Sequence, residues 1–308
     1  MSEAEVHVWV PYPEMVADLR GLSPRLRVGL FTGTESPVDV PEPHILVAPY
    51  TLGTKELAAA LRSPRLRVIQ LLTAGYEQVA PLVPDGVLLC NARGVHDAST
   101  AELAVALMLA ALRGIPDFVR AQQTGEWRHA TYPSLADRTV LILGYGSIGQ
   151  ALERRLAGFE VRILRVARRP RPGVHGIEEV WGLLGEADVV VVLTPLTAET
   201  RHLVDEKFLA RMRPGALLVN VARGAVVDTE ALVHAVAAGR IRAALDVTDP
   251  EPLPPDHPLW RLPGVLISPH VGGDTTAFLP RARQFIVDQI SRYLNGEPLH
   301  NVVAVDTD

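Results

Sequence analysis

The sequence predicts an α/β protein of two domains, each a doubly wound parallel sheet covered by helices, with an active-site cleft between the domains. Three observations carry this prediction. Short runs rich in β-branched residues and leucine alternate with helical patterns along almost the whole chain, and this alternation implies parallel sheets with crossover helices. Several of the runs are apolar at every position, as strands buried on both faces must be. The 308 residues are also enough for two domains of ordinary size.

The predicted strands form two series. The first comprises "VGLFT", "HILVAPY", "LRVIQLL" and "VLLCN", and the second comprises "TVLILG", "VRILRV", "DVVVVL", "LLVNV", "AALDV" and "VLISP". Between the series, Ser99 followed by Glu102 has the pattern of a capping box, so a helix is expected to begin near Thr100. This helix is apolar on every side from Leu103 to Leu112, which predicts that its domain or a partner subunit covers it.

The boundary between the domains is expected near Asp97. We assign residues 1–97 and 276–308 to one domain and residues 98–275 to the other. In this scheme a last helix, from about Phe278 to Leu294, runs back to the first domain.

Composition narrows the class of protein further. A formal net charge of −5 argues against a general nucleic-acid binder, and the sequence contains no apolar run as long as a membrane span requires. Cys90 is the only cysteine, so internal disulfides are impossible and we expect no metal site built from cysteines. With no signal peptide evident at its acidic N-terminus, the protein is expected in the cytoplasm.

A glycine-rich loop opens the second series of strands. After the strand "TVLIL" the chain continues with Gly144, Tyr145, Gly146, Ser147, Ile148 and Gly149, and then with a helical pattern. In such a loop the first glycine permits a tight turn, the second lets the backbone approach a pyrophosphate, and the third lets helix and strand pack closely. The helix N-terminus supplies amide donors for the phosphates. The pattern therefore predicts a Rossmann-like dinucleotide site.

The stretch "RVARRPR" after this loop bears on which dinucleotide binds. An NAD-binding protein normally carries an acid at the end of the second strand, where it accepts hydrogen bonds from the adenosine ribose. This chain has Ala167 there, followed by Arg168 and Arg169, and arginine can hold a 2′-phosphate with charged hydrogen bonds. We therefore expect NADP(H) to be favoured over NAD(H), the alternative being a solvated basic loop. Arg165 and Arg171 are weaker candidates, because one lies inside the strand and the other follows a proline.

Three later loops each carry one residue suited to hydride transfer. They are "VNVARGAVVD" with Arg223, "LDVTDPEPLP" with Glu251 and "ISPHVGGDTT" with His270. Reduction of a keto acid needs a cation for the carboxylate, a proton donor for the carbonyl oxygen, and an anion that orients that donor. Taken singly, Arg223 could cap a turn, Glu251 could be an exposed loop acid and His270 could be structural. Together, after a cofactor loop, they predict an active site.

At this point the chain resembles the D-isomer-specific 2-hydroxyacid dehydrogenase family, almost from end to end. The residues that carry the resemblance are "TAGYEQV", "STAELAVALML", "GYGSIG", "PLTAET", "VNVARGAVVD", "LDVTDPEPLP" and "SPHVGG". The closest likeness is to the glyoxylate/hydroxypyruvate reductases. The resemblance implies that residues 1–97 and 276–308 bind substrate, that residues 98–275 bind the dinucleotide, and that the protein is a homodimer formed through residues 98–127.

The resemblance also assigns individual residues. It implies that the family's catalytic residues fall on Arg223, Glu251 and His270, and that the amides of Thr73, Ala74 and Gly75 bind the substrate carboxylate. It places Asp246 against the nicotinamide carboxamide. Further cofactor contacts are expected at Thr194, Pro195, Thr200, Val221, Ala222, Gly272 and Gly273. Leu193 departs from the histidine that many members have before "PLT".

The charges of the residues expected near the substrate help to distinguish specialised members of the family. A phosphoglycerate enzyme needs cations for the distal phosphate, and the corresponding loop 50–53 contains no arginine. We expect NAD(P)H-dependent reduction of a small 2-keto acid, such as glyoxylate or hydroxypyruvate, to the D-2-hydroxy acid. An NAD(H)-dependent dehydrogenase of another substrate, such as phosphoglycerate, and a non-catalytic corepressor-like protein that senses dinucleotides remain alternatives. The sequence leaves open which side chains near Tyr50, His96 and Trp127 line the substrate pocket.

Overall fold

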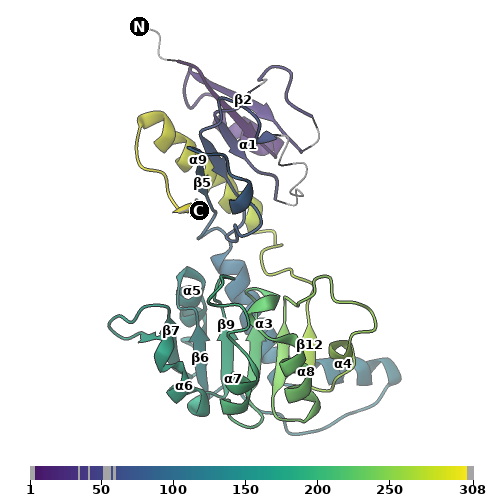
Figure 1. Cartoon of the computed structure of the whole chain (residues 1–308). Helices are drawn as coiled ribbons and strands as arrows, with labels where there is room; N and C mark the ends of the chain where they lie inside the picture. Colours follow the sequence, from purple (N-terminus) through teal and green to yellow (C-terminus); the bar gives the residue numbers. More distant parts are fainter. Residues whose placement is uncertain (1–3, 34, 41, 51–56, 58–59, 304–308) are drawn as a thin grey trace. The chain divides into compact units, whose positions relative to one another are not determined.

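The computed structural model describes residues 4–33, 35–40, 42–50, 57 and 60–303. The chain divides into two compact units, which are both drawn in Figure 1. The first unit contains Met1–His96 and Thr276–Asp308, and the second contains Asp97–Thr275.

The first unit is built on a sheet with the strand order β13-β5-β4-β3-β1-β2 in its described part. Its strands are β1 (Val6–Val10), β2 (Leu26–Leu30), β3 (Ile45–Val47), β4 (Val68–Gln70), β5 (Leu88–Cys90) and β13 (Val302–Val303). All pair in parallel except β13, which is antiparallel to β5. The helices α1 (Pro13–Leu19) and α9 (Phe278–Asn295) share one core with this sheet, so the end of the chain completes the unit. A short 3-10 helix, η1 (Ala80–Leu82), packs with the other core.

The second unit has a parallel sheet with the strand order β12-β11-β10-β9-β6-β7-β8. Its strands are β6 (Thr139–Leu143), β7 (Arg162–Ala167), β8 (His175–Gly176), β9 (Val189–Val192), β10 (Leu217–Asn220), β11 (Arg242–Leu245) and β12 (Val265–Ile267). This is the order of a dinucleotide-binding fold, and its switch point lies between β6 and β9. Ligands of such sheets bind at the carboxyl ends of the strands near that point.

Helices cover both faces of the second sheet (Figure 1). On one face lie α3 (Asp97–Leu112) and α5 (Ser147–Leu156). On the other lie α6 (Val180–Leu183), α7 (Glu206–Arg211) and α8 (Thr229–Ala237), with the 3-10 helices η2 (Ile177–Glu179), η3 (Leu184–Glu186), η4 (Gly224–Val226) and η5 (Pro258–Trp260) in the connections. Successive residues of β6 are buried alternately in the two cores, which explains why this strand is apolar throughout.

The predicted start of the long helix is wrong. α3 begins at Asp97 rather than near Thr100. The Ser99 hydroxyl does not cap the helix; it lies 2.7 Å from the Thr275 hydroxyl. The capping-box pattern was therefore misleading, because a contact with a residue far along the chain uses the same side chain.

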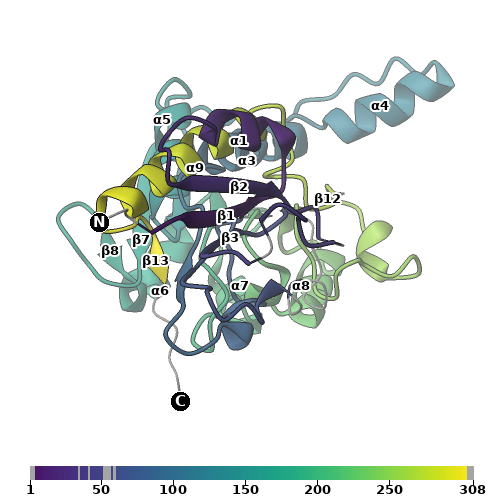
Figure 2. The ribbon, with the colours of Figure 1, turned by 90° about the horizontal axis from the view of Figure 1, so that it is seen from above.

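A second helix, α4 (Ile115–Thr124), follows α3 after a break. In Figure 2 it extends away from the sheet of its own unit. Within the described residues, no single helix is long and apolar enough to cross a membrane, although α3 and α4, bent by 61°, pass that test of length and composition as a pair.

Candidate active site and cofactor site

The three catalytic candidates follow three neighbouring strands of the second sheet. Arg223 follows β10, Glu251 follows β11 and His270 follows β12, and these strands pair in parallel in that order. Carboxyl ends of adjacent parallel strands meet at one edge of a sheet. Arg223, Glu251 and His270 therefore follow strands that end at the same edge of the sheet. Glu251 lies 28 positions after Arg223 in the sequence, and His270 lies 19 positions after Glu251.

His270 and Glu251 form a direct pair. Nδ1 of His270 lies 2.5 Å from Oε1 of Glu251, and both side chains are partly exposed. Because the carboxylate engages Nδ1, the imidazole presents Nε2 as the nitrogen that can exchange a proton with a ligand. The pair thus has the donor and the orienting anion that acid catalysis at a carbonyl oxygen requires.

Asp246 holds the loop that carries His270. Its buried carboxylate accepts hydrogen bonds from the Ser268 hydroxyl at 2.6 Å and from the amides of Val271 and Gly272 at 2.9 Å. Its backbone carbonyl accepts the His270 amide at 2.7 Å. His270 has a φ of 53°, an uncommon conformation for a residue with a side chain, and these bonds hold it there. Asp246 is therefore a positioning residue for the His270 loop.

Arg223 lies in a tightly packed turn. The next residue, Gly224, contacts the following loop so closely that a Cβ there would lie 1.9 Å from the carbonyl oxygen of Thr248. Only glycine fits at this close approach, and the turn therefore fixes where the backbone of Arg223 leaves the strand. The partly buried Arg223 donates through Nη1 to the carbonyl of Ala222 at 2.7 Å.

The glycine loop has the geometry that its sequence predicts. Gly144 has a φ of 103°, and a Cβ on it would lie 2.6 Å from the backbone of Leu193 and Thr194. A Cβ on Gly149 would meet atoms at 3.2 Å, whereas nothing lies within 4 Å of a Cβ on Gly146. The first and third glycines thus serve the packing of the loop, and the second leaves open space for a ligand.

The residues at this loop fit a dinucleotide. The first-turn amides of α5 have no partners inside the helix and point toward the loop, as phosphate binding requires. Beside the loop, at the end of β9, the hydroxyl of Thr194 is buried and has no hydrogen-bond partner within the described part of the chain. A buried hydroxyl without a partner is costly, and a bound dinucleotide would supply one.

The two arginines expected to select NADP(H) are exposed. Arg168 and Arg169 directly follow β7, next to the strand that leads into the glycine loop. The pKa of Glu199 is lowered, first by a hydrogen bond from the Thr197 hydroxyl and in smaller part by the charge of Arg168. The charge of Arg168 thus affects the carboxylate of Glu199, which lies in the loop after β9.

Arg165 and Arg171 have separate roles around Tyr145. Arg165 pairs with Glu153, to which the Tyr145 hydroxyl also donates, and this bond with Arg165 lowers the pKa of Glu153. Arg171 donates through Nη2 to the carbonyl of Tyr145 at 2.7 Å, and its guanidinium carbon lies 5.7 Å from the centre of the Tyr145 ring. Sequence reasoning set Arg171 aside because it follows a proline, yet it ties the arginine-rich loop to the glycine loop.

In the first unit, the loop predicted to bind a carboxylate turns its carbonyls inward. Leu72 O accepts from His96 Nε2 at 2.7 Å, and the next three carbonyls accept at 2.7 to 2.8 Å from the Ala92 amide, the Asn91 side chain and the Thr73 hydroxyl. Within the described residues, the amides of Ala74 and Gly75 form no hydrogen bond. Backbone amides without a partner are the donors that an anion can bind.

Comparison with known proteins identifies the family of the chain. The family model described as "D-isomer specific 2-hydroxyacid dehydrogenase, NAD binding domain" matches residues 105–272, more than half of the chain. The chain belongs to the D-isomer-specific 2-hydroxyacid dehydrogenase family. It is accordingly an NAD(P)-dependent oxidoreductase that acts on CH–OH donors.

Individual relatives of this dehydrogenase are similar over most of their length. A glyoxylate reductase of Korarchaeum cryptofilum is 36% identical over 78% of this chain and 77% of its own. A glyoxylate/hydroxypyruvate reductase B of Pectobacterium atrosepticum is 37% identical over 78% of this chain and 80% of its own. The structure of an NADPH-dependent glyoxylate/hydroxypyruvate reductase of Sinorhizobium meliloti, in complex with NADP and malonate, has a TM-score of 0.79 and 27% identity, covering 98% of each chain.

The remaining cofactor candidates of this dehydrogenase all lie in loops after strands of the second sheet. Thr194, Pro195 and Thr200 follow β9, Val221 and Ala222 follow β10, and Gly272 and Gly273 follow β12. The Thr200 hydroxyl donates to the carbonyl of Pro195 at 2.6 Å, which closes the loop after β9. No group of three or more histidine, cysteine, aspartate or glutamate side chains that could hold a metal occurs among the described residues.

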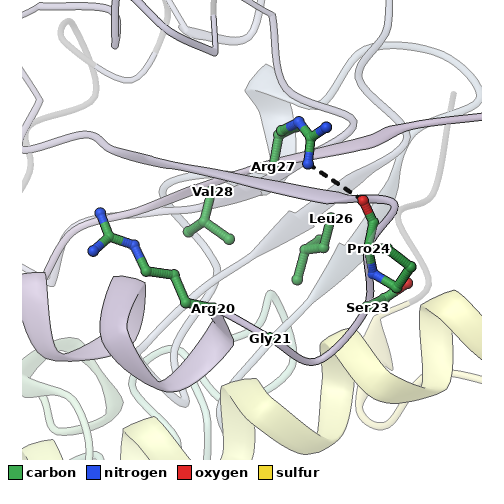
Figure 3. A pocket seen from close by; sticks show the side chains of 7 residues that line it. All are labelled: Arg20, Gly21, Ser23, Pro24, Leu26, Arg27 and Val28. Atoms are coloured by element: carbon green, nitrogen blue, oxygen red, sulfur yellow. Dashed lines mark hydrogen bonds between the residues drawn. The ribbon is translucent and has the colours of Figure 1, made fainter.

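A cavity of the first unit contains no predicted site residue. It has a volume of about 570 Å³ and lies between the end of α1 and β2, where Arg27 donates to the carbonyl of Pro24 at 3.3 Å (Figure 3). Of the loop 50–53, compared above with that of phosphoglycerate enzymes, residues 51–53 lie outside the described part of the chain.

Proposed function

We propose that this dehydrogenase reduces a small 2-keto acid of the glyoxylate or hydroxypyruvate type to the D-2-hydroxy acid, with NADPH favoured over NADH. The observation that carries the proposal is the His270–Glu251 pair. The strands that precede Arg223, Glu251 and His270 are neighbours in one sheet. The names of the similar glyoxylate reductases support the substrate class.

Binding of the substrate carboxylate falls to the loop of the first unit. The amides of Ala74 and Gly75 are the donors that this loop keeps available, because neither forms a hydrogen bond within the described residues. A phosphorylated substrate needs cations for its distal phosphate, whereas a small keto acid needs donors for its carboxylate alone. Binding through two backbone amides is therefore in keeping with a short keto acid.

Arg223 and His270 act on the carbonyl group. Arg223 binds the substrate through its guanidinium and polarises the keto oxygen. His270, in its protonated form, gives the Nε2 proton to the oxygen as negative charge develops there, while Glu251 orients the ring from Nδ1. A reduced nicotinamide held at the glycine loop would supply the hydride for the carbonyl carbon. Interactions that strengthen as the oxyanion develops are those that lower the barrier.

Arg168 and Arg169 favour NADP(H) in this proposal. They directly follow Ala167, which stands where an NAD-specific protein carries an acid, and a guanidinium holds a phosphate through paired charged hydrogen bonds. The Sinorhizobium meliloti relative, an NADPH-dependent reductase whose structure contains NADP, is in keeping with this cofactor.

We further propose a homodimer that forms through residues 98–127. The described part of this region exposes apolar side chains on and just after α4. Ile115 is 46% exposed, Val119 51% and Trp127 96%, and α4 extends away from its own sheet (Figure 2). Large exposed apolar side chains grouped in this way are typical of an interface between protein chains.

The test is the initial rate of NADPH and NADH oxidation with glyoxylate and with hydroxypyruvate. We expect reduction of both acids and a higher kcat/KM with NADPH. Replacing Arg168 and Arg169 with alanine should lower kcat/KM for NADPH by about 10- to 100-fold, the worth of a charged hydrogen bond, and leave NADH nearly unaffected. Arg154→Ala, an exposed arginine on α5, is the matched control. If neither acid were reduced with either cofactor, the proposed reductase activity would be contradicted. Equal kcat/KM with NADPH and NADH would contradict only the proposed role of Arg168 and Arg169.

A further inference from the structure

The side chain of Arg171 joins two loops that are distant in sequence. Its Nη2 donates to the carbonyl oxygen of Tyr145, the second residue of the glycine loop, at 2.7 Å. Its guanidinium carbon also lies 5.7 Å from the centre of the Tyr145 ring. A guanidinium that contacts both a carbonyl oxygen and an aromatic ring has a defined orientation. The end of this side chain is therefore held on the glycine loop.

Tyr145 is itself firmly held. Its amide donates to the carbonyl of Val166 at 2.8 Å, and its hydroxyl donates to the carboxylate of Glu153 on α5. Arg165 pairs with the same carboxylate and lies 5.8 Å from the centre of the Tyr145 ring. The amide, the hydroxyl and the carbonyl of Tyr145 thus all have partners, so this residue is a fixed point for Arg171.

The backbone of Arg171 is fixed by a tight turn. Its amide donates to the carbonyl of Val174 at 3.0 Å, and the Val174 amide donates back to its carbonyl at 2.8 Å. Between them stand Pro172 and Gly173, which has a φ of 75°. Proline followed by a glycine of positive φ is characteristic of a type II turn. This turn sets the direction in which the Arg171 side chain leaves the chain.

The residues before Arg171 are anchored at their other end. Ala167 pairs with Gly176 in the sheet, and a Cβ on Gly176 would lie 3.2 Å from Pro170, so the proline packs closely against this strand. Arg168 and Arg169 lie between these contacts and are exposed. The two arginines thus belong to a short span that is held at both ends.

Anchoring affects how well such a span binds a phosphate. Ordering a loop and long side chains on binding opposes association, and a loop held beforehand avoids much of that cost. We propose that Arg171 is a positioning residue for cofactor selection. Its bond to Tyr145 holds Arg168 and Arg169 where they bind the 2′-phosphate of NADP(H). This role rests on the proposed preference for NADP(H) and adds a residue that acts through the other two arginines.

The first experiment compares the Kd values of NADPH and NADH, measured by the fluorescence of the reduced nicotinamide. Arg171→Ala should raise the Kd of NADPH by about 5- to 20-fold and leave the Kd of NADH and the kcat at saturating NADPH unchanged. Arg154→Ala, at an exposed position of α5, is the control for the loss of one positive charge. An unchanged Kd for NADPH, or an equal rise for both cofactors, would overturn the proposal, because the latter is the result of mere support of the glycine loop.

A double-mutant cycle separates positioning from direct contact with the phosphate. In a protein that already carries Arg168→Ala and Arg169→Ala, adding Arg171→Ala should change the Kd of NADPH by less than about twofold, because residues that act through one another are not additive. A further loss as large as that in the wild-type background would show that Arg171 acts on the phosphate itself and would overturn the positioning role.

The same cycle distinguishes the two proposals. If Arg168→Ala with Arg169→Ala weakens NADPH binding and Arg171→Ala does not, only the role of Arg171 falls. If the replacement of Arg168 and Arg169 has no effect on NADPH binding, their proposed role in cofactor selection falls as well.

Gly173→Ala gives a second variant that leaves Arg171 in place. A Cβ on Gly173 meets no atom within 4 Å, but the positive φ is strained for alanine, so the turn that directs Arg171 should shift. We expect a smaller rise in the Kd of NADPH, again without an effect on NADH. Gly239→Ala is the matched control, since Gly239 has a φ of 66° and equally open space. Equal effects of the two alanines on NADPH binding would contradict the role of the turn.

Discussion

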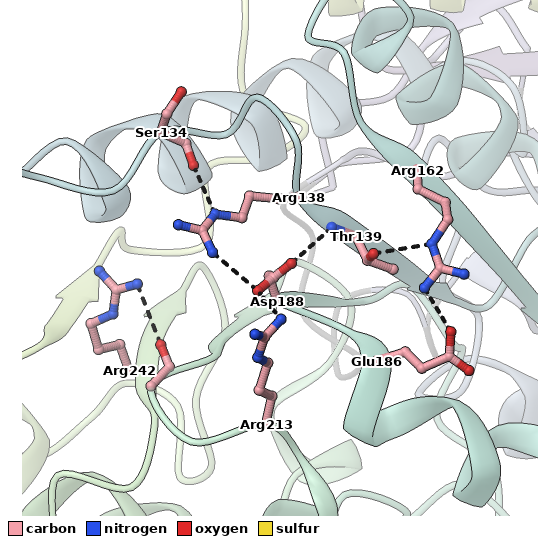
Figure 4. A network of polar contacts seen from close by, with 9 residues as sticks. Ser134, Arg138, Thr139, Arg162, Glu186, Asp188, Arg213 and Arg242 are labelled. Atoms are coloured by element: carbon pink, nitrogen blue, oxygen red, sulfur yellow. Dashed lines mark hydrogen bonds and ion pairs between the residues drawn. The ribbon is translucent and has the colours of Figure 1, made fainter.

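The two ends of the sheet in the second unit use the same kinds of charged residue for different purposes. At the amino end, Asp188 accepts hydrogen bonds from Arg138 at 3.3 Å, from Arg213 at 3.0 Å and from the Thr139 amide at 3.0 Å (Figure 4). Close by, Arg162 donates to Glu186 at 2.6 Å. Each of these acids is matched by arginines of the same fold, so the network serves the fold itself.

At the carboxyl end, the fold positions polar side chains but leaves some of their hydrogen-bonding atoms without a partner in the described residues. Glu251 engages one nitrogen of His270 and leaves the other. Arg168 and Arg169 are exposed, and Thr194 has a buried hydroxyl without a partner in the described residues. Position along the strand, rather than residue type, therefore distinguishes the proposed reaction site from the structural ion network.

The largest expected effect is that of His270→Ala. Loss of a positioned acid should lower kcat for keto-acid reduction by about 10²- to 10⁴-fold, while the free energy of unfolding stays close to that of the wild type because the side chain is partly exposed. Steady-state rates and urea unfolding measure the two quantities. His234→Ala, at an exposed position of α8, is the matched control. Turnover close to wild type would remove His270 from the mechanism.

Glu251→Gln should have the next largest effect. Without the carboxylate, the His270 ring loses the anion that orients it, so kcat for reduction should fall by about 10- to 100-fold. Steady-state rates measure this loss, with Glu230→Gln on the exposed face of α8 as control. A kcat equal to that of the wild type would show that the pair seen in the structure does not act in catalysis.

Asp188→Asn should show the opposite pattern at the amino end. The change removes the charge that Arg138 and Arg213 share and should lower the free energy of unfolding by about 1–3 kcal/mol, with kcat unchanged under conditions where the protein is folded. Urea unfolding tests the prediction, and Asp256→Asn at an exposed loop position is the control. A loss of kcat without a loss of stability would refute the division between the two ends.

The smallest effect concerns the amino end of the first unit's sheet. His44 accepts the His7 amide at Nδ1, 2.9 Å away, and its pKa is lowered from 6.5, first by burial and then by the charges of His7, Arg65 and Arg67. A lowered pKa in the folded state stabilises the protein above the unfolded value and loses that contribution as the pH falls below it. The wild type should thus become less stable from about pH 7 to pH 5. His44→Gln should flatten that part of the stability profile; an identical slope would exclude His44 as the cause.

Much of the fold follows from the sequence because its strands are buried on both faces. The runs "TVLILG" and "DVVVVL" coincide with β6 and β9, whose residues contact two cores. β1, with its histidine among apolar residues, and the two-residue β13 were not predicted. β13 is too short for a pattern, and only its antiparallel pairing with β5 defines it.

The site shows the same division. The glycine loop and the three catalytic candidates could be found because each follows a recognisable strand. The contacts of Asp246, Arg171 and His96 could not be found, because they are hydrogen bonds between residues distant in sequence: Asp246 with the His270 loop, Arg171 with Tyr145 and His96 with Leu72. Such bonds leave no periodic signal in the chain.

The reaction proposed for this dehydrogenase is hydride transfer from NADPH to the keto carbon of a small 2-keto acid. It is tested most directly by reducing hydroxypyruvate with NADPH deuterated at both C4 positions and analysing the product by mass spectrometry and chiral chromatography. We expect D-glycerate with one deuterium at C2. Unlabelled product, or the L-isomer, would contradict it.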